Sequence, residues 1–160
     1  MKKLLILVCA LFALSATSFA QKKWQIGDIY DVDGVKGVVF AVTQDGEHGR
    51  ILSFDQLIDC WWDEAKQWCS EHGEGWRLPT VQELHIIFIL GKDLDFNQAL
   101  LFAGAQPILC GGEYDYWSGE EYDSEEAWMV TMYVGGYDCP RKKSNDYSNY
   151  GRLARAVFAF

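Results

Sequence analysis

The sequence predicts a single α+β domain with antiparallel β-sheets and two main helices. Segments rich in β-branched and aromatic residues lie towards both ends of the chain. Two stretches between them, residues 55–72 and 81–91, place apolar residues at helical spacing. The 160 residues are 49% hydrophobic and 15% aromatic, a composition that excludes a disordered chain. Strands, then helices, then strands again are typical of the α+β class.

The first twenty residues have the pattern of a secretory signal peptide. Lys2 and Lys3 precede an apolar run over residues 4–14, and Ser18 and Ala20 supply small residues before a cleavage site. The apolar run is too short to span a hydrocarbon core of about 30 Å. We therefore expect cleavage after Ala20 and one domain over residues 21–160. The protein would be secreted, periplasmic or on the cell surface, without a transmembrane segment.

The predicted strands begin with a hairpin. Residues 29–32 and 35–43 read as two strands around the turn signal Asp33-Gly34, and residues 50–53 as a short third strand. After the helices, residues 116–118 and 127–134 predict a second hairpin. Residues 153–160 predict one final strand.

The first predicted helix, residues 55–72, carries one apolar face. Its inward residues at three- and four-residue spacing are Ile58, Trp61, Trp62, Ala65, Trp68 and Cys69. Thr80 and Glu83 predict a capping box that starts the second helix, which ends near Gly91. Residues 95–103 predict a further short helix.

The chain is acidic, with 14 Lys and Arg against 23 Asp and Glu, a net charge of −9. Such a surface repels phosphate backbones, so we expect no nucleic-acid partner. The densest run of carboxylates supplies the best metal candidate, a Ca²⁺ site at Glu120, Glu121, Asp123 and Glu125. The run lacks the spacing and the glycine of a calcium loop, so a solvated hairpin tip is the alternative.

The segment 141–150 contains the best candidate ligand-binding residues. They combine positive charge with tyrosine and asparagine, residue types common on adaptable binding surfaces: Arg141, Lys142, Asn145, Tyr147, Asn149 and Tyr150. The alternative is an ordinary polar loop.

Four cysteines follow the signal peptide, and they allow three full pairings. Cys60 and Cys69 fall on opposite faces of the first predicted helix, about 13 Å apart along it, too far to join. Cys110 and Cys139 flank the predicted second hairpin almost symmetrically. We therefore expect a Cys110–Cys139 disulfide in an exported protein.

No catalytic constellation is visible in the sequence. His48, His72 and His85 show no metal-ligand spacing, and no Gly-x-Ser-x-Gly elbow occurs. We therefore expect a protein that is not an enzyme.

Several blocks in a fixed order resemble the Lcl C-terminal domain family. They are residues 37–40, residues 45–49, the helix residues Trp62, Ala65 and Cys69, the central motif 75–80 with Glu83 and Leu84, then residues 116–118, 127–128 and 155–157. The family is similar in fold to C-type lectin-like domains, and its studied members tend towards binding and adhesion. Within this pattern we interpret a structural motif at Trp76, Arg77, Pro79, Thr80, Glu83 and Trp117.

The sequence departs from the calcium-dependent lectins of that fold. Neither Glu-Pro-Asn nor Gln-Pro-Asp occurs, and Trp-Asn-Asp is missing, so the sugar-coordinating calcium site is not carried over. The paired copper-ligating cysteines of formylglycine-generating oxidases have no match either.

The functional hypothesis is a secreted or surface-exposed binding module without chemistry. It would recognise a glycan or protein ligand, on a cell surface or in the envelope, through loops of its C-terminal half. The alternative is a structural or assembly component of the cell envelope that binds a partner chain.

Overall fold

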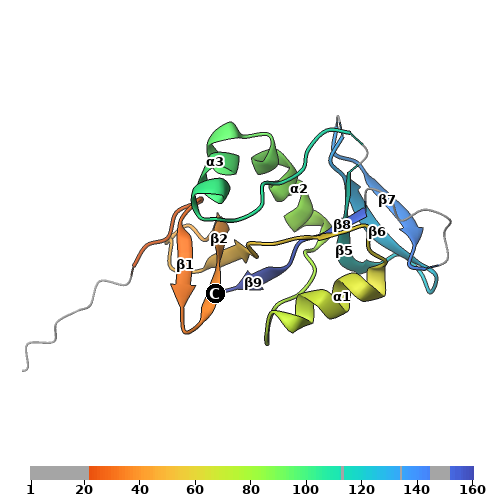
Figure 1. The fold of residues 1–160 in the computed structure, drawn as a ribbon, viewed down its shortest axis with the longest axis horizontal. Helices are drawn as coiled ribbons and strands as arrows, with labels where there is room; N and C mark the ends of the chain where they lie inside the picture. Colours follow the sequence, from red (N-terminus) through yellow and green to blue (C-terminus); the bar gives the residue numbers. More distant parts are fainter. Residues whose placement is uncertain (1–21, 113, 134, 145–151) are drawn as a thin grey trace, which may run out of the picture.

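The computed structural model describes residues 22–112, 114–133, 135–144 and 152–160. The predicted signal peptide lies outside these residues. The described chain forms a mixed α+β fold with three helices and two sheets (Figure 1). None of its helices is long and apolar enough to cross a membrane.

The first sheet joins the N-terminal strands to the end of the chain. Its strand order is β1-β2-β3-β9, with all pairs antiparallel, over Ile29–Val32, Val35–Val42, Gly49–Leu52 and Val157–Ala159. The turn between β1 and β2 is the predicted one. Asp33 and Gly34 both have positive φ, 51° and 84°, which a tight hairpin turn of this kind requires.

The second sheet has the order β4-β8-β5-β6-β7. Its strands are Leu57–Ile58, Arg152–Ala154, Asp115–Glu121, Glu126–Thr131 and Asp138–Lys142. The β5–β6 hairpin was predicted, but β7 was not, and its last two residues fall in the segment 141–150 that was interpreted as a loop. The expectation of purely antiparallel sheets is wrong at one pair, since β5 and β8 run parallel.

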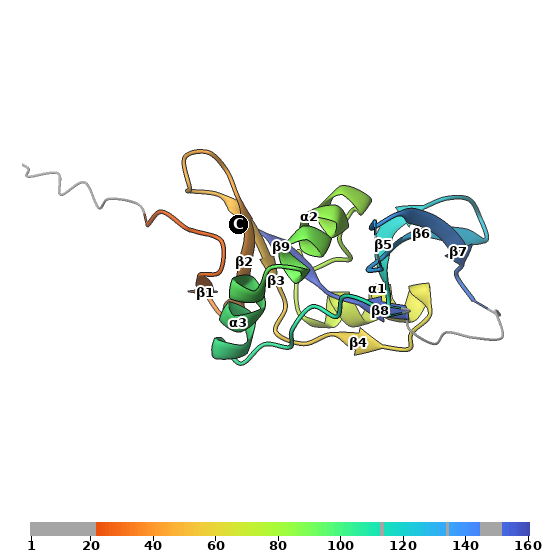
Figure 2. The same cartoon turned by 90° about the horizontal axis from the view of Figure 1, so that it is seen from above.

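The predicted single final strand is also wrong. The chain leaves the second sheet after β8 and enters the first sheet as β9, with Arg155 and Ala156 between them. The same stretch of chain therefore connects the two sheets, as Figure 2 shows. The alternation of residues along the sequence predicts an extended segment. It does not predict that the segment passes from one sheet to the other.

The first helix is shorter than predicted. α1 covers Trp62–Glu71, whereas residues 55–61 are not helical and include β4, whose Leu57 and Ile58 pair with β8. Asp59 has a φ of 53°, which a continuing helix does not allow. The Trp61 amide donates to the Glu64 carboxylate at 2.8 Å and so fixes the start of the helix.

The other two helices agree with their predicted positions. α2 covers Val81–Gly91, and α3 covers Leu94–Phe102. The Asp93 side chain accepts hydrogen bonds from the amides of Asp95 and Phe96, which caps α3.

The β5–β6 hairpin is covered on both faces near its open end, because α1 and α2 pack on opposite sides of it. Tyr116 and Val130 face α2, while their neighbours Trp117 and Met129 face α1. All four side chains are fully buried. Two separate hydrophobic clusters therefore form, one on each face of the same sheet.

Candidate functional site

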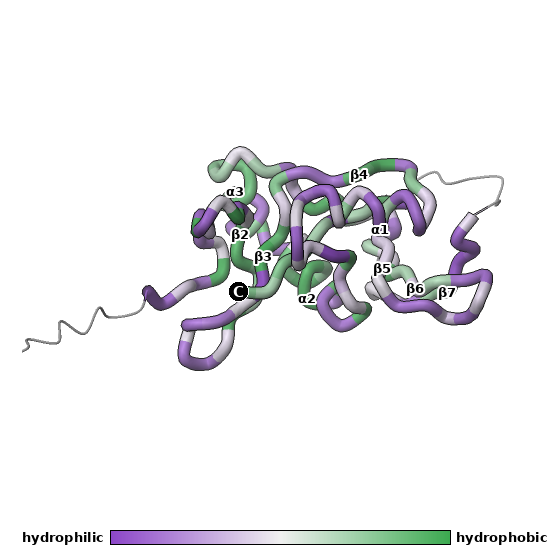
Figure 3. Tube along the Cα trace, turned by 90° about the horizontal axis from the view of Figure 1, so that it is seen from below, coloured by the Kyte–Doolittle hydropathy of each residue, from purple (hydrophilic) through white to green (hydrophobic). Residues whose placement is uncertain are grey.

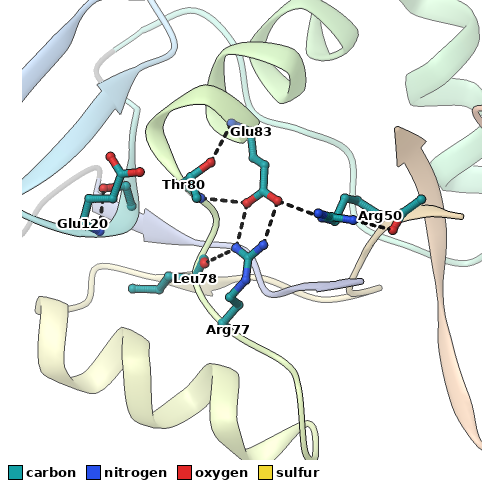
Figure 4. A network of polar contacts seen from close by, with 8 residues as sticks. Arg50, Arg77, Leu78, Thr80, Glu83 and Glu120 are labelled. Carbon is teal, nitrogen blue, oxygen red and sulfur yellow. Dashed lines mark hydrogen bonds and ion pairs between the residues drawn. The ribbon is translucent and has the colours of Figure 1, made fainter. Parts of the chain in front are cut away.

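The motif around Arg77 forms a partly exposed polar brace at the start of α2. The Thr80 hydroxyl accepts from the Glu83 amide at 3.1 Å, and the Glu83 carboxylate accepts from the Thr80 amide at 2.8 Å. The predicted capping box is therefore present. Arg77 donates to both oxygens of the same carboxylate, at 2.7 and 2.8 Å, and Arg50 adds a third contact from β3 (Figure 4).

These contacts keep Glu83 ionised. Burial by itself raises the pKa of this carboxyl, but hydrogen bonds from Arg77 and the Thr80 amide, with the charges of Arg77 and Arg50, lower it overall. The same hydrogen bond to Glu83 raises the pKa of Arg77. A charged brace thus joins β3, the segment before α2 and α2 itself.

The rest of the motif is structural. Trp76 is buried and packs on Phe158 with ring centroids 5.6 Å apart. The Pro79 carbonyl accepts from the Gly119 amide at 2.8 Å, where β5 bulges away from β6. Trp117 is fully buried, and its indole N–H donates to the Cys60 carbonyl at 2.9 Å. The motif therefore positions β5 and its hairpin.

The acidic run at the end of that hairpin already holds a positive charge. The Lys143 ammonium donates to the Glu121 carboxylate and to the carbonyl oxygens of Asp123 and Ser124. This Lys143 side chain is only 11% exposed. The Asp123 carboxylate accepts from the amides of Glu125 and Glu126. These oxygen atoms of the hairpin therefore already accept hydrogen bonds from within the protein.

The predicted Ca²⁺ ligands do not converge. Among the described residues, no group of three or more His, Cys, Asp or Glu side chains is placed to hold a metal ion. Glu120 lies on the bulge of β5, exposed, with its amide donating to Ser118 Oγ. The described geometry is that of a hairpin tip closed by a lysine.

The predicted ligand-binding residues are only partly described. Asn145, Tyr147, Asn149 and Tyr150 lie outside the described residues. Arg141 and Lys142 are exposed on β7, a strand and not the predicted loop. As neighbours on a strand they point to opposite faces of the sheet, so they do not act together.

Lys142 belongs to a surface that sequence reasoning missed, which we call the aromatic shelf: Tyr122, Glu126, Trp128, Pro140 and Lys142. The register pairs Trp128 with Pro140 and Glu126 with Lys142, so all four share one face of the β6–β7 pair. Tyr122 meets Trp128 edge to face, with ring centroids 4.9 Å apart. Tyr122 is 52% exposed, and Trp128 is partly exposed.

The shelf is open because α2 covers only part of this face. Further along the same strands, Val130 is buried under the α2 cluster, and His85 of α2 contacts the Asp138 carboxylate at 2.6 Å. Beyond the His85–Asp138 contact, the same face of the sheet carries the Tyr122–Trp128 pair. The alternation at residues 126, 128 and 130 was available in the sequence, but the limit of α2 was not.

The predicted Cys110–Cys139 disulfide is wrong. Cys60, Cys69, Cys110 and Cys139 are all free thiols. Cys110 packs against the cluster on the α2 side, whereas Cys139 belongs to the cluster on the α1 side. The two sulfur atoms are therefore on opposite faces of one sheet. The symmetry of two cysteines about a hairpin says nothing about which face each one occupies.

The cysteines on the α1 side are deeply buried. Burial raises the pKa of Cys60 and of Cys69 to about 12, so both thiols stay protonated at neutral pH. The prediction that they share one helix is wrong, because Cys60 precedes the start of α1. Neither thiol is placed as a nucleophile.

No protein-family model matches this chain, and no curated protein matches it. The fold defines a mixed α+β protein.

Proposed function

We propose that the protein is an exported, non-catalytic binding module that recognises a glycan or protein ligand of the cell surface or envelope. The proposal includes membership of the Lcl C-terminal domain family and a C-type lectin-like fold, on the sequence blocks given above. The single observation that carries the binding role is the aromatic shelf. Of its two rings, Tyr122 is exposed and Trp128 is partly exposed, beside strand residues that are buried.

The chemistry of the shelf suits a ligand with both apolar and polar groups. Aromatic faces pack on the C–H surface of a sugar or on an apolar side chain, at a low entropy cost for Tyr and Trp. Glu126 and Lys142 lie opposite each other at the edge of the shelf and supply an acceptor and a donor. A few polar groups beside an apolar surface are typical of ligand sites.

The test is binding of the full chain, exported by its host cell, to a glycan array and to envelope proteins. We expect binding that Trp128→Ala weakens about tenfold or more, since about 1.4 kcal/mol of lost contact has that effect. We expect equal binding with Ca²⁺ and with chelator, because Lys143 uses the hairpin oxygens.

The matched control compares two tyrosines that are each 52% exposed. Tyr122→Ala removes part of the shelf, whereas Tyr133→Ala changes a tyrosine in the β6–β7 connection. Loss of binding in the first variant alone supports the proposal. Equal loss in both variants, or folded protein that binds neither glycans nor envelope proteins, would refute it.

One observation favours the alternative role as an envelope assembly component. Leu94, Leu101 and Phe102 of α3 are 80%, 50% and 88% exposed and, at helical spacing, lie on one side of the helix. Figure 3, coloured by hydropathy, shows hydrophobic residues in α3 towards one end of the molecule. A stable oligomer or a co-purified partner that Phe102→Glu abolishes would support this role. A monomer without partners would count against it.

A further inference from the structure

A groove of about 240 Å³ opens between β2, β3 and α2, away from the aromatic shelf. One wall is aliphatic and consists of Ala41, Val42 and Ile86, and the polar end carries Arg50 and Glu83. Ile86 is 40% exposed on α2, so this wall faces solvent. An aliphatic wall next to a charged group is the chemistry of an amphipathic ligand.

The polar end has an excess of positive charge. Arg77 takes both oxygens of the Glu83 carboxylate, and Arg50 approaches the same carboxylate with Nε, at 3.2 Å (Figure 4). Two guanidinium groups therefore share one carboxylate, in a chain whose net charge is −9. The uncompensated charge belongs to Arg50, which lines the groove, and not to Arg77, which does not.

Arg50 also keeps donors free. Its Nη1 donates to the Gly49 carbonyl at 3.0 Å, and the side chain is 40% exposed. Within the described chain, Nη2 has no acceptor, because the polar contacts of Arg50 end at Gly49 and Glu83. A guanidinium edge with free N–H groups matches a planar carboxylate.

We propose that this groove binds the C-terminal carboxylate of a peptide whose last residue is aliphatic. The carboxylate contacts Arg50, and the aliphatic side chain lies against Val42 and Ile86. The groove volume of about 240 Å³ lies below the range of about 300–1,000 Å³ that is typical of drug-sized ligands, so one aliphatic residue with its carboxylate suits it. A longer aliphatic acid would leave the end of its chain in water. The described lining contains no aromatic ring for a sugar to stack on.

The test is a titration of the full chain, followed by amide chemical shifts, with acetyl-Gly-Gly-Leu as the free acid and as the C-terminal amide. We expect the acid to bind at least about tenfold more tightly, because the amide lacks the charge that Arg50 recognises. The shifts should centre on Val42, Arg50 and Ile86. Octanoate is the second arm, and it should bind more weakly than the peptide acid.

The matched variants are Arg50→Gln and Arg77→Gln, because each removes one arginine from Glu83 but only Arg50 lines the groove. Arg50→Gln should weaken binding of the acid about tenfold. Arg77→Gln should weaken it less, because it lets Glu83 offset more of the Arg50 charge but removes no donor from the groove. Ile86→Asp is a further variant at an exposed position, and its carboxylate should repel the peptide acid. Equal binding of acid and amide, no effect of Arg50→Gln and Ile86→Asp, or tighter binding of octanoate would overturn the proposal.

Discussion

The Arg155 guanidinium donates from Nε to the Ser53 carbonyl at 2.8 Å, at the point where the chain passes from one sheet to the other. Its Nη1 donates to the Gln106 carbonyl at 2.9 Å. The Ser53 hydroxyl accepts from the Ala156 amide on the same junction. One fully buried side chain thus joins the end of β3, the α3–β5 connection and the β8–β9 junction.

Arg155→Met should destabilise the fold by about 2–4 kcal/mol, because the buried Ser53 carbonyl and the Gln106 carbonyl both lose their donor. Burial lowers the pKa of Arg155 to about 10, so the side chain remains charged at neutral pH. Denaturant unfolding of both proteins measures the difference. Arg141→Met, at an exposed arginine, is the control and should change stability little. Equal stability of Arg155→Met and wild type would contradict the structural role.

Glu83→Gln should reduce the dependence of stability on acidic pH. The folded protein holds the pKa of Glu83 below its usual value, so this carboxyl stabilises the fold above the unfolded pKa. That contribution is lost as the pH falls through the folded pKa. Melting temperatures between pH 3 and pH 7 should therefore fall less steeply, in roughly that window, for Glu83→Gln than for wild type. Parallel curves would disprove the assignment.

Cys60 and Cys69 should react slowly with iodoacetamide in the folded protein, because burial raises the pKa of each thiol to about 12. Denaturant should make both accessible. Peptide mapping without reductant should recover Cys110 and Cys139 as alkylated thiols. A cross-linked Cys110–Cys139 peptide from native protein would contradict their placement on opposite faces of the sheet.

Lys143→Met should loosen the β5–β6 hairpin tip, because the ammonium bridges Glu121 to two hairpin carbonyl groups. Hydrogen exchange should be faster at the amides of residues 121–126. Lys142→Met is the matched control, since Lys142 is the neighbouring lysine, exposed at the end of β7. Similar exchange in both variants would show that the bridge does not hold the hairpin.

Local signals in the sequence were enough where neighbouring residues decide the structure. Asp33-Gly34 fixed the first turn because both positions need positive φ. Thr80 and Glu83 fixed the start of α2, because a capping box is complete within four residues. The third helix was predicted within one residue of its observed bounds, and the structure adds the Asp93 cap.

Predictions failed where distant segments compete for the same residues. Residues 55–61 have helical spacing, yet Leu57 and Ile58 pair with β8, and an extended strand excludes a helix there. The aromatic shelf was missed for a related reason. Its exposure depends on where α2 stops covering the sheet, a limit set by the contact of His85 with Asp138.

The sequence by itself determined the α+β class, the first hairpin, the two later helices and the acidic surface, because short-range geometry and composition carry that information. Only the tertiary structure decided which sheet face each residue occupies. It put Cys110 and Cys139 on opposite faces, divided the final strand at Arg155 and brought Arg50 to Glu83. The physical reason is that pairing across a sheet and burial against a helix join residues far apart in the chain, and no local pattern specifies that choice.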